Sequence, residues 1–107
     1  MPANLAAIRR EVRAGRYRVT IHCARRLLKR AISVLDIEFA VGNDDPELLE
    51  DYEDDPRGPS CLILGWTQSG EPLHVQIGYT EIPEVITVYR PDPTKWEDNR
   101  HRRQGSP

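Results

Sequence analysis

The chain has 107 residues and two cysteines, which suffices for one domain with a modest core but not for a disulfide framework. No apolar run approaches the length of a membrane span and no signal-peptide core precedes the first helix, so we expect a cytoplasmic protein with no membrane partner. The net charge of −2 hides a segregation: residues 1–30 hold nine Arg or Lys and one acid, residues 31–55 hold ten acids and no Arg or Lys, and such a basic end attracts nucleic acid or an acidic protein.

Residues 3–14 have the spacing of an amphipathic helix, with Leu5, Ile8 and Val12 on one face. Gly15 is placed to end this helix, because glycine readily adopts the left-handed conformation of a C-cap. A short extended link follows.

The segment from Tyr17 to Ile32 predicts a central helix with Thr20 as its N-cap. His22, Arg26 and Arg30 recur at four-residue steps and so form a cationic row. The row begins in the first helical turn, where free amides and the helix dipole favour an anion, which suits a phosphate site. The same pattern is also typical of a helix face that is only solvated. The residues expected to face the core are Ala24, Leu27, Leu28 and Ala31.

Ser33 and Asp36 resemble a capping box that opens a third helix, which ends near Gly42. Residues 43–46 predict a turn. The acidic run after it is expected to be an edge strand that its charge protects from unwanted pairing. Its carboxylates lack the ordered spacing of a Ca²⁺ loop, so we expect them to face solvent or a partner.

Three further strands are predicted at residues 60–67, 72–79 and 85–90. His74 lies on the polar face of the second of these, where it is either solvent-facing or functional. A one-residue change in loop length decides whether Tyr89 shares the face of His74. The pattern predicts an α+β domain over residues 1–103, with two to three helices on a four-stranded antiparallel sheet, a short C-terminal helix or tail, and disorder at 104–107.

Four potential metal ligands occur in the predicted helix and strands, but their spacing fits no zinc motif. No glycine-rich phosphate loop or other cofactor fingerprint is present. We therefore expect neither a metal nor another cofactor, and a small-molecule enzyme has no motif in its favour. The four residues are His22, Cys23, Cys61 and His74.

Several motifs occur in order along residues 5–100. They are Tyr17, Thr20, His22, Arg26, Arg30 and Ile32; Ser60-Cys61-Leu62; Pro72-Leu73-His74-Val75; Thr87-Val88-Tyr89-Arg90-Pro91; and Trp96. Together they resemble a family of small bacterial domains with a His-Ala-x-x-Arg-x-x-x-Arg-Gly-Ile segment, from which the chain departs at Cys23 and Ala31. That family looks related to the RelE-like toxins of the barnase–colicin–RelE ribonuclease group. The resemblance implies helices on an antiparallel sheet, RNA cleavage without a metal, and a cognate antitoxin, often of a zinc-finger type.

Such cleavage needs a base for the ribose 2′-OH, an acid for the 5′-oxygen and cations around the phosphorus. His22 and His74 are the candidate base and acid. Arg26 and Arg30 would hold the phosphate, and Tyr89 would orient it or stack on a base. Further substrate contacts are expected from Arg25, Lys29, Arg90, Trp96, Arg100, Arg102 and Arg103.

The expected function is therefore a toxin-type endoribonuclease, an mRNA interferase of a toxin–antitoxin pair. The competing expectation is a non-catalytic module of the same fold that binds a protein or a nucleic acid, because fold does not fix function. Histidines that converge with Arg26 and Arg30 in one cleft would favour the enzyme, and histidines on opposite faces would favour the module. An exposed edge strand would also allow a homodimer.

Overall fold

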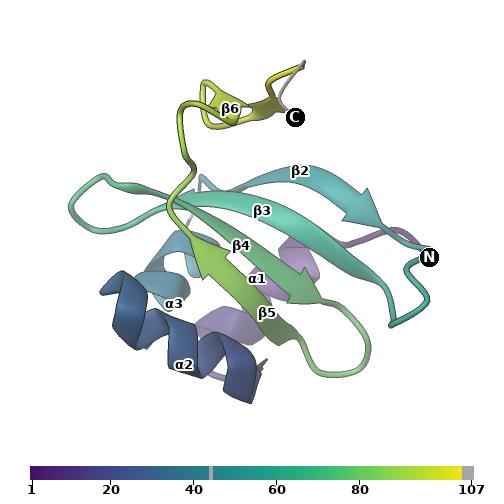
Figure 1. Cartoon of the computed structure of the whole chain (residues 1–107). Coiled ribbons are helices and arrows are strands. Elements are labelled where there is room, and N and C mark those ends of the chain that lie inside the picture. Colours follow the sequence, from purple (N-terminus) through teal and green to yellow (C-terminus); the bar gives the residue numbers. More distant parts are fainter. Residues whose placement is uncertain (44, 105–107) are drawn as a thin grey trace.

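The structure is a computed structural model that describes residues 1–43 and 45–104. Position 44 of the predicted turn and residues 105–107 of the predicted disordered tail lie outside the described residues. Three helices lie on one face of a five-stranded sheet (Figure 1). The helices are α1 (Leu5–Arg13), α2 (Ile21–Arg30) and α3 (Val34–Gly42). The strands are β1 (Arg18–Val19), β2 (Glu47–Tyr52), β3 (Ser60–Trp66), β4 (Pro72–Gly78), β5 (Glu84–Tyr89), β6 (Trp96–Glu97) and β7 (His101–Arg102).

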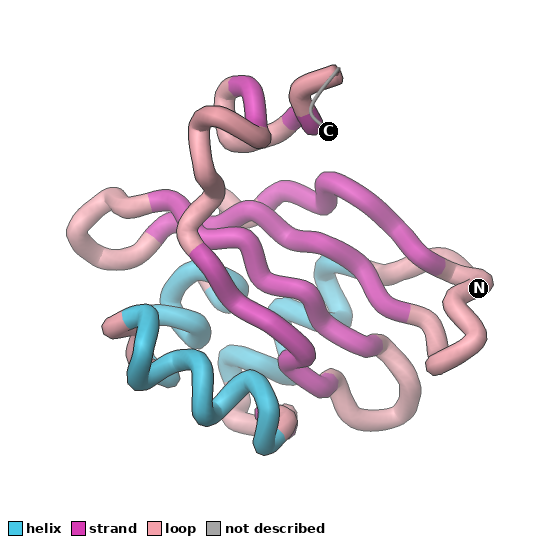
Figure 2. The backbone as a smooth tube through the Cα atoms, viewed as in Figure 1, coloured by secondary structure: helices cyan, strands magenta, loops and turns pink. Residues whose placement is uncertain are grey.

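The large sheet has the strand order β1-β5-β4-β3-β2, which confirms the α+β class and the acidic strand β2 as an edge. Strands β2 to β5 pair antiparallel, as predicted. The link before α2 is a fifth strand that pairs parallel with β5, so the predicted count of four was wrong. Two backbone bonds, Arg18 N–H to Pro83 O at 2.9 Å and Thr20 N–H to Val85 O at 3.1 Å, form this pair. This strand has only two residues. Figure 2 shows the longer strands of the sheet, with the helices on one side of them.

Local hydrogen bonds set the helix ends where the sequence predicts them. Thr20 Oγ1 accepts from the Cys23 amide at 3.0 Å, which makes Thr20 the N-cap of α2. Ser33 and Asp36 form the predicted capping box of α3, with bonds of 3.0 and 2.9 Å. Helix α2 ends at Ala31, whose φ of 54° is left-handed and normally favours glycine.

The core lies between the helices and one face of the sheet. Cys23 and Leu27 of α2 are buried there, whereas Leu28 is 88% exposed. The predicted inward stripe of α2 was therefore correct for Leu27 but wrong for Ala24, Leu28 and Ala31, which are exposed, because packing against β5 turns Cys23 into the core instead. The buried side chains that form this core include Ile8, Val12, Ile37, Val41, Ile63, Leu73, Val75, Ile77, Val85 and Val88.

The C-terminal region is a small β-hairpin, not the predicted helix or tail. Strands β6 and β7 pair antiparallel, and the turn between them places Asp98 and Asn99 at φ of 52° and 62°. Asp and Asn tolerate this conformation better than other non-glycine residues. The hairpin lies on the face of the sheet opposite the helices (Figure 1). We call residues 92–104 the C-terminal strap.

Candidate functional site

The outward face of α2 is an exposed cationic surface. It consists of His22, Arg25, Arg26 and Lys29, and α2 contains no acidic residue. Arg26 Nε donates to His22 Nε2 at 3.0 Å, so that imidazole nitrogen carries no proton in this arrangement. Within the described chain, Arg25 and Lys29 have neither a hydrogen-bond partner nor a carboxylate partner. The surface is therefore available to an external anion.

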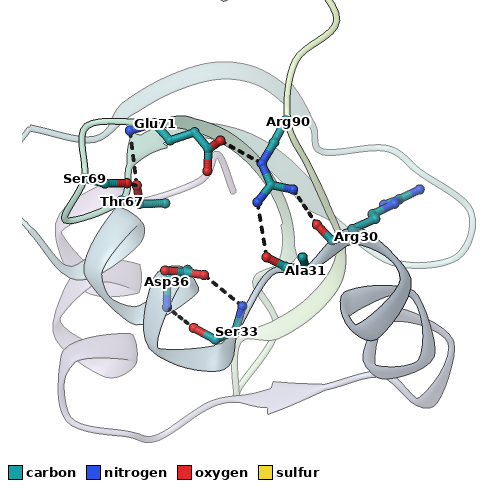
Figure 3. Close-up of polar contacts among 8 residues, drawn as sticks. All are labelled: Arg30, Ala31, Ser33, Asp36, Thr67, Ser69, Glu71 and Arg90. Carbon is teal, nitrogen blue, oxygen red and sulfur yellow. Dashed lines mark hydrogen bonds and ion pairs between the residues drawn. The ribbon is translucent and has the colours of Figure 1, made fainter.

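Arg30, the third member of the predicted row, lies apart from this surface. Its Nη1 donates to the backbone oxygen of Val88 on β5 at 2.6 Å, and the residue is half-buried. The side chain extends away from the guanidinium of Arg90 (Figure 3). The hydrogen bond from Arg30 to Val88 therefore connects α2 to β5 of the sheet.

Arg90 caps the carboxyl end of α2. Its guanidinium donates to the backbone oxygens of Arg30 and Ala31, the latter at 3.1 Å, and pairs with Glu71 at 3.0 Å (Figure 3). The Glu71 amide is in turn held by Thr67 Oγ1 at 3.1 Å. Carbonyls at a helix end need such donors, so the contacts of Arg90 serve the fold.

His74 is fully buried on the sheet face opposite the helices. Its Nε2 lies 2.6 Å from the backbone oxygen of Asn99, which can only accept, so Nε2 carries the proton. In the neutral ring Nδ1 then accepts from the Tyr89 hydroxyl at 3.2 Å. The Trp96 ring stands edge-on to the imidazole at 4.4 Å between ring centres. Burial holds the pKa of His74 below its ordinary value, although the Asn99 carbonyl and Glu50 act in the opposite direction.

A β-bulge decides that Tyr89 faces His74, a question that the sequence left open. Ile77 pairs with Val85 and Gln76 with Thr87, so Ile86 is an extra residue on β5. The pairing beyond it shifts by one, and Tyr89 comes opposite His74.

The C-terminal strap is anchored to the acidic strand β2 by two arginines. Arg100 donates to both carboxylate oxygens of Glu47 at 2.8 and 2.7 Å, and Arg102 to both of Glu50 at 2.9 and 3.0 Å. These bonds lower the pKa of each glutamate. We expected these carboxylates to face solvent or a partner, and both instead bind arginines of the strap, although the Glu47 side chain stays 40% exposed.

Rings complete the contact between strap and sheet. The Arg102 guanidinium lies 4.6 Å above the Trp96 ring and that of Arg100 lies 5.8 Å from the Trp66 ring. Arg103 Nε donates to the Pro93 carbonyl within the strap at 2.7 Å. The sequence analysis did not single out Glu47 and Glu50. The only indication of their role in the sequence was that their acidic run is complementary in charge to the basic residues near the C-terminus.

The predicted site residues thus form two groups with the sheet between them. His22 and Arg26 lie together on the helix side, beside Arg25 and Lys29. His74 and Tyr89 lie on the other face of the sheet, where Trp96 of the strap covers His74. The structure does not bring the two histidines into one cleft, and the groove of about 390 Å³ between α3 and the β3–β4 turn contains neither.

The cysteines belong to the core. Both are free and buried, and burial raises the pKa of the Cys61 thiol to about 12. Within residues 1–43 and 45–104, no three His, Cys, Asp or Glu side chains are grouped so that they would hold a metal ion.

Three helices on one face of a mainly antiparallel sheet define a small α+β domain. The chain belongs to the DUF4258 family, a domain of unknown function whose model matches residues 19–90. That span runs from β1 to Arg90, so it includes the cationic surface of α2 and His74 but ends before the strap. Comparison with curated proteins and with solved structures gives no match. In the described part of the chain, no helix has the length and apolarity needed to cross a membrane.

Proposed function

We propose that the outward face of α2 binds the phosphate backbone of RNA and that the chain is a toxin-type endoribonuclease acting on mRNA in the cytoplasm. The observation that carries the proposal is the exposed His22–Arg26 pair on a helix that holds two unpaired cations and no acid. The sequence motifs resemble a family of small bacterial domains that looks related to the RelE-like toxins, and this resemblance supports the same reaction class. It also suggests a cognate antitoxin, often of a zinc-finger type.

Phosphate binding would activate His22. A phosphate oxygen is a stronger acceptor for a guanidinium than a neutral imidazole is, so it takes the N–H of Arg26. This frees His22 Nε2 to accept the proton of the ribose 2′-OH. The 2′-oxygen then bonds to phosphorus, the bond to the 5′-oxygen breaks, and the leaving oxygen takes a proton from water.

In this proposal His74 and Arg30 are positioning residues. Arg30 fixes α2 on β5 through the Val88 carbonyl, and His74 joins the strap to the sheet through Asn99. Neither has to touch the RNA. This differs from a mechanism in which His22 and His74 act as base and acid on one phosphate.

A non-catalytic RNA-binding module is the second candidate. The observation in its favour is that the sheet separates the two histidines, so only one imidazole lies at the cationic surface. General acid–base cleavage is normally served by two groups. Binding and cleavage therefore have to be measured separately.

Binding is tested by fluorescence anisotropy with a short single-stranded RNA at several salt concentrations. We expect Arg25→Gln with Lys29→Gln to weaken binding and to reduce the slope of log K against log salt by about 1.4, since each phosphate contact contributes about 0.7. The control is Arg57→Gln, which removes an exposed arginine already paired with Asp55. RNA binding that is absent, or equally weakened in the control, would refute both candidates.

Cleavage is tested by induction in a bacterial host, with growth and primer extension on mRNA as readouts. We expect His22→Gln to abolish growth arrest and cleavage while RNA binding persists. His101→Gln, an exposed histidine on β7, is the matched control and should remain active. Wild-type protein that binds RNA without cutting it would establish the module instead. Co-expression of the neighbouring reading frame should suppress arrest if it encodes the antitoxin.

A further inference from the structure

The sheet face that carries His74 is constructed as a binding surface. Leu62 and Leu64 of β3 are buried on it although they lie outside the core under the helices. Cross-strand pairing aligns Leu64 with Glu47 on one side and with His74 on the other. The surface therefore has a buried leucine in its middle, the Glu47 carboxylate on one side and the His74 ring on the other.

No backbone ladder holds the strap on this surface. Within the described residues, every backbone–backbone hydrogen bond made by residues 92–103 has its partner inside the strap. The connection consists of the two Arg–Glu pairs, the His74–Asn99 bond and the packing of Trp96. Partly exposed ion pairs contribute little each and are screened by salt, so the buried Trp96 ring and the His74–Asn99 bond supply most of the connection. Because no backbone pairing joins the strap to the sheet, the strap can open without breaking the hydrogen bonds between the strands.

The two strap arginines define what the surface recognises. Arg100 is the last residue of the β6–β7 turn and Arg102 lies on β7, and the hairpin directs both guanidiniums to carboxylates of β2. Each meets a carboxylate of β2 through two parallel bonds and each lies near a tryptophan ring. A guanidinium can donate two parallel hydrogen bonds to one carboxylate, whereas the ammonium of lysine cannot.

We propose that this face is an exchangeable docking site for a β-hairpin that carries an Arg-x-Arg sequence, occupied in the isolated chain by its own C-terminal strap. A partner protein that presents two arginines with this spacing displaces the strap and covers His74 in its place. This inference does not rest on the proposed function, because it concerns the opposite face of the sheet from α2.

The first experiment measures how fast diethyl pyrocarbonate modifies each histidine of the full chain, by mass spectrometry. His22 is exposed and serves as the internal reference. We expect slow modification of His74 in the wild type and an increase of about tenfold in Glu47→Gln with Glu50→Gln, in line with the loss of two exposed pairs. Glu53→Gln with Asp54→Asn removes the same charge near the end of β2 and should leave the rate unchanged. His74 that stays protected in the first variant while thermal melting shows a folded chain would overturn the proposal.

The second experiment tests exchange with a synthetic peptide of residues 92–104. In the full chain carrying Arg100→Gln with Arg102→Gln, His74 should become reactive, and excess peptide should restore its protection. A peptide with lysine at both arginine positions should not restore it. Failure of the arginine peptide, or equal protection by the lysine peptide, would overturn the docking site and leave only a loose hairpin.

Discussion

The tightest contact between a helix and the sheet makes Gly65→Ala the most informative substitution. Gly65 lies on β3 directly beneath α3. A Cβ atom added there would stand 2.2 Å from the backbone oxygen of Ala40 and 2.6 Å from its backbone carbon. Both are backbone atoms, which cannot rotate aside as a flexible side chain would. The helix or the strand would have to move by more than about 1 Å to reach an ordinary contact.

The cost of this movement can be estimated from overpacked cores, where an inserted methyl group costs about 1–3 kcal/mol. Because both elements are regular and well packed, we expect the upper end, about 3 kcal/mol. That corresponds to a fall in Tm of roughly 12–20 °C for a domain of this size. Adding Ala40→Gly should not restore full stability, because it removes the 2.9 Å contact with the Ala40 Cβ but leaves the two closer contacts with the backbone of residue 40.

Gly78→Ala is the matched control. Gly78 also lies in a strand of the same sheet, but its nearest neighbour for an added Cβ is Ile86 Cδ1 at 3.6 Å, an ordinary contact. We expect a change of less than about 1 kcal/mol. Urea unfolding followed by tryptophan fluorescence and thermal unfolding followed by circular dichroism measure both variants. If Gly65→Ala is no less stable than Gly78→Ala, the close approach of α3 to β3 is wrong.

Three further outcomes are expected from the same unfolding measurements. Ala31→Gly should stabilise the chain by about 1 kcal/mol because it relieves the left-handed φ of 54° at the end of α2; an unchanged or lower urea midpoint would contradict this conformation. Ser33→Ala should cost about 1 kcal/mol through loss of the bond to the Asp36 amide, and Ser33→Asp, which keeps an acceptor, should cost less. Stability should fall as the pH drops below the ordinary His74 pKa of 6.5 towards its lowered folded value, because the unfolded chain binds the proton more readily. His74→Gln should lose this slope below the ordinary histidine pKa of 6.5, and an identical slope in the variant would show that His74 is not its source.

The candidate site shows which features a helical sequence pattern predicts and which it does not. The four-residue spacing of His22, Arg26 and Arg30 correctly predicts one row along α2, since the helical period is local. It does not predict that Arg30 turns to the Val88 carbonyl while Arg26 stays with His22. That choice depends on where β5 lies, and β5 is more than fifty residues away along the chain.

His74 shows the same limit in a strand. Alternation correctly places it on the face opposite Leu73 and Val75, because successive side chains of a strand point to opposite sides. Its burial comes from Trp96 and Asn99, which the pattern treated as part of a polar tail. A strand pattern reports the face of a residue and not what covers that face.

The sequence by itself determined the order of the three helices and of strands β2 to β5, the caps at Thr20 and Ser33, and the alternation of β4, because neighbouring backbone groups and the two structural periods set these features. Only the tertiary structure decided the rotation of α2, the bulge that brings Tyr89 to His74, the pairing of β1 with β5 and the fastening of the strap to β2. Each of these depends on a contact between distant segments. Its free energy comes from burial and from pairing of opposite charges, and neither is written in the local pattern of either segment.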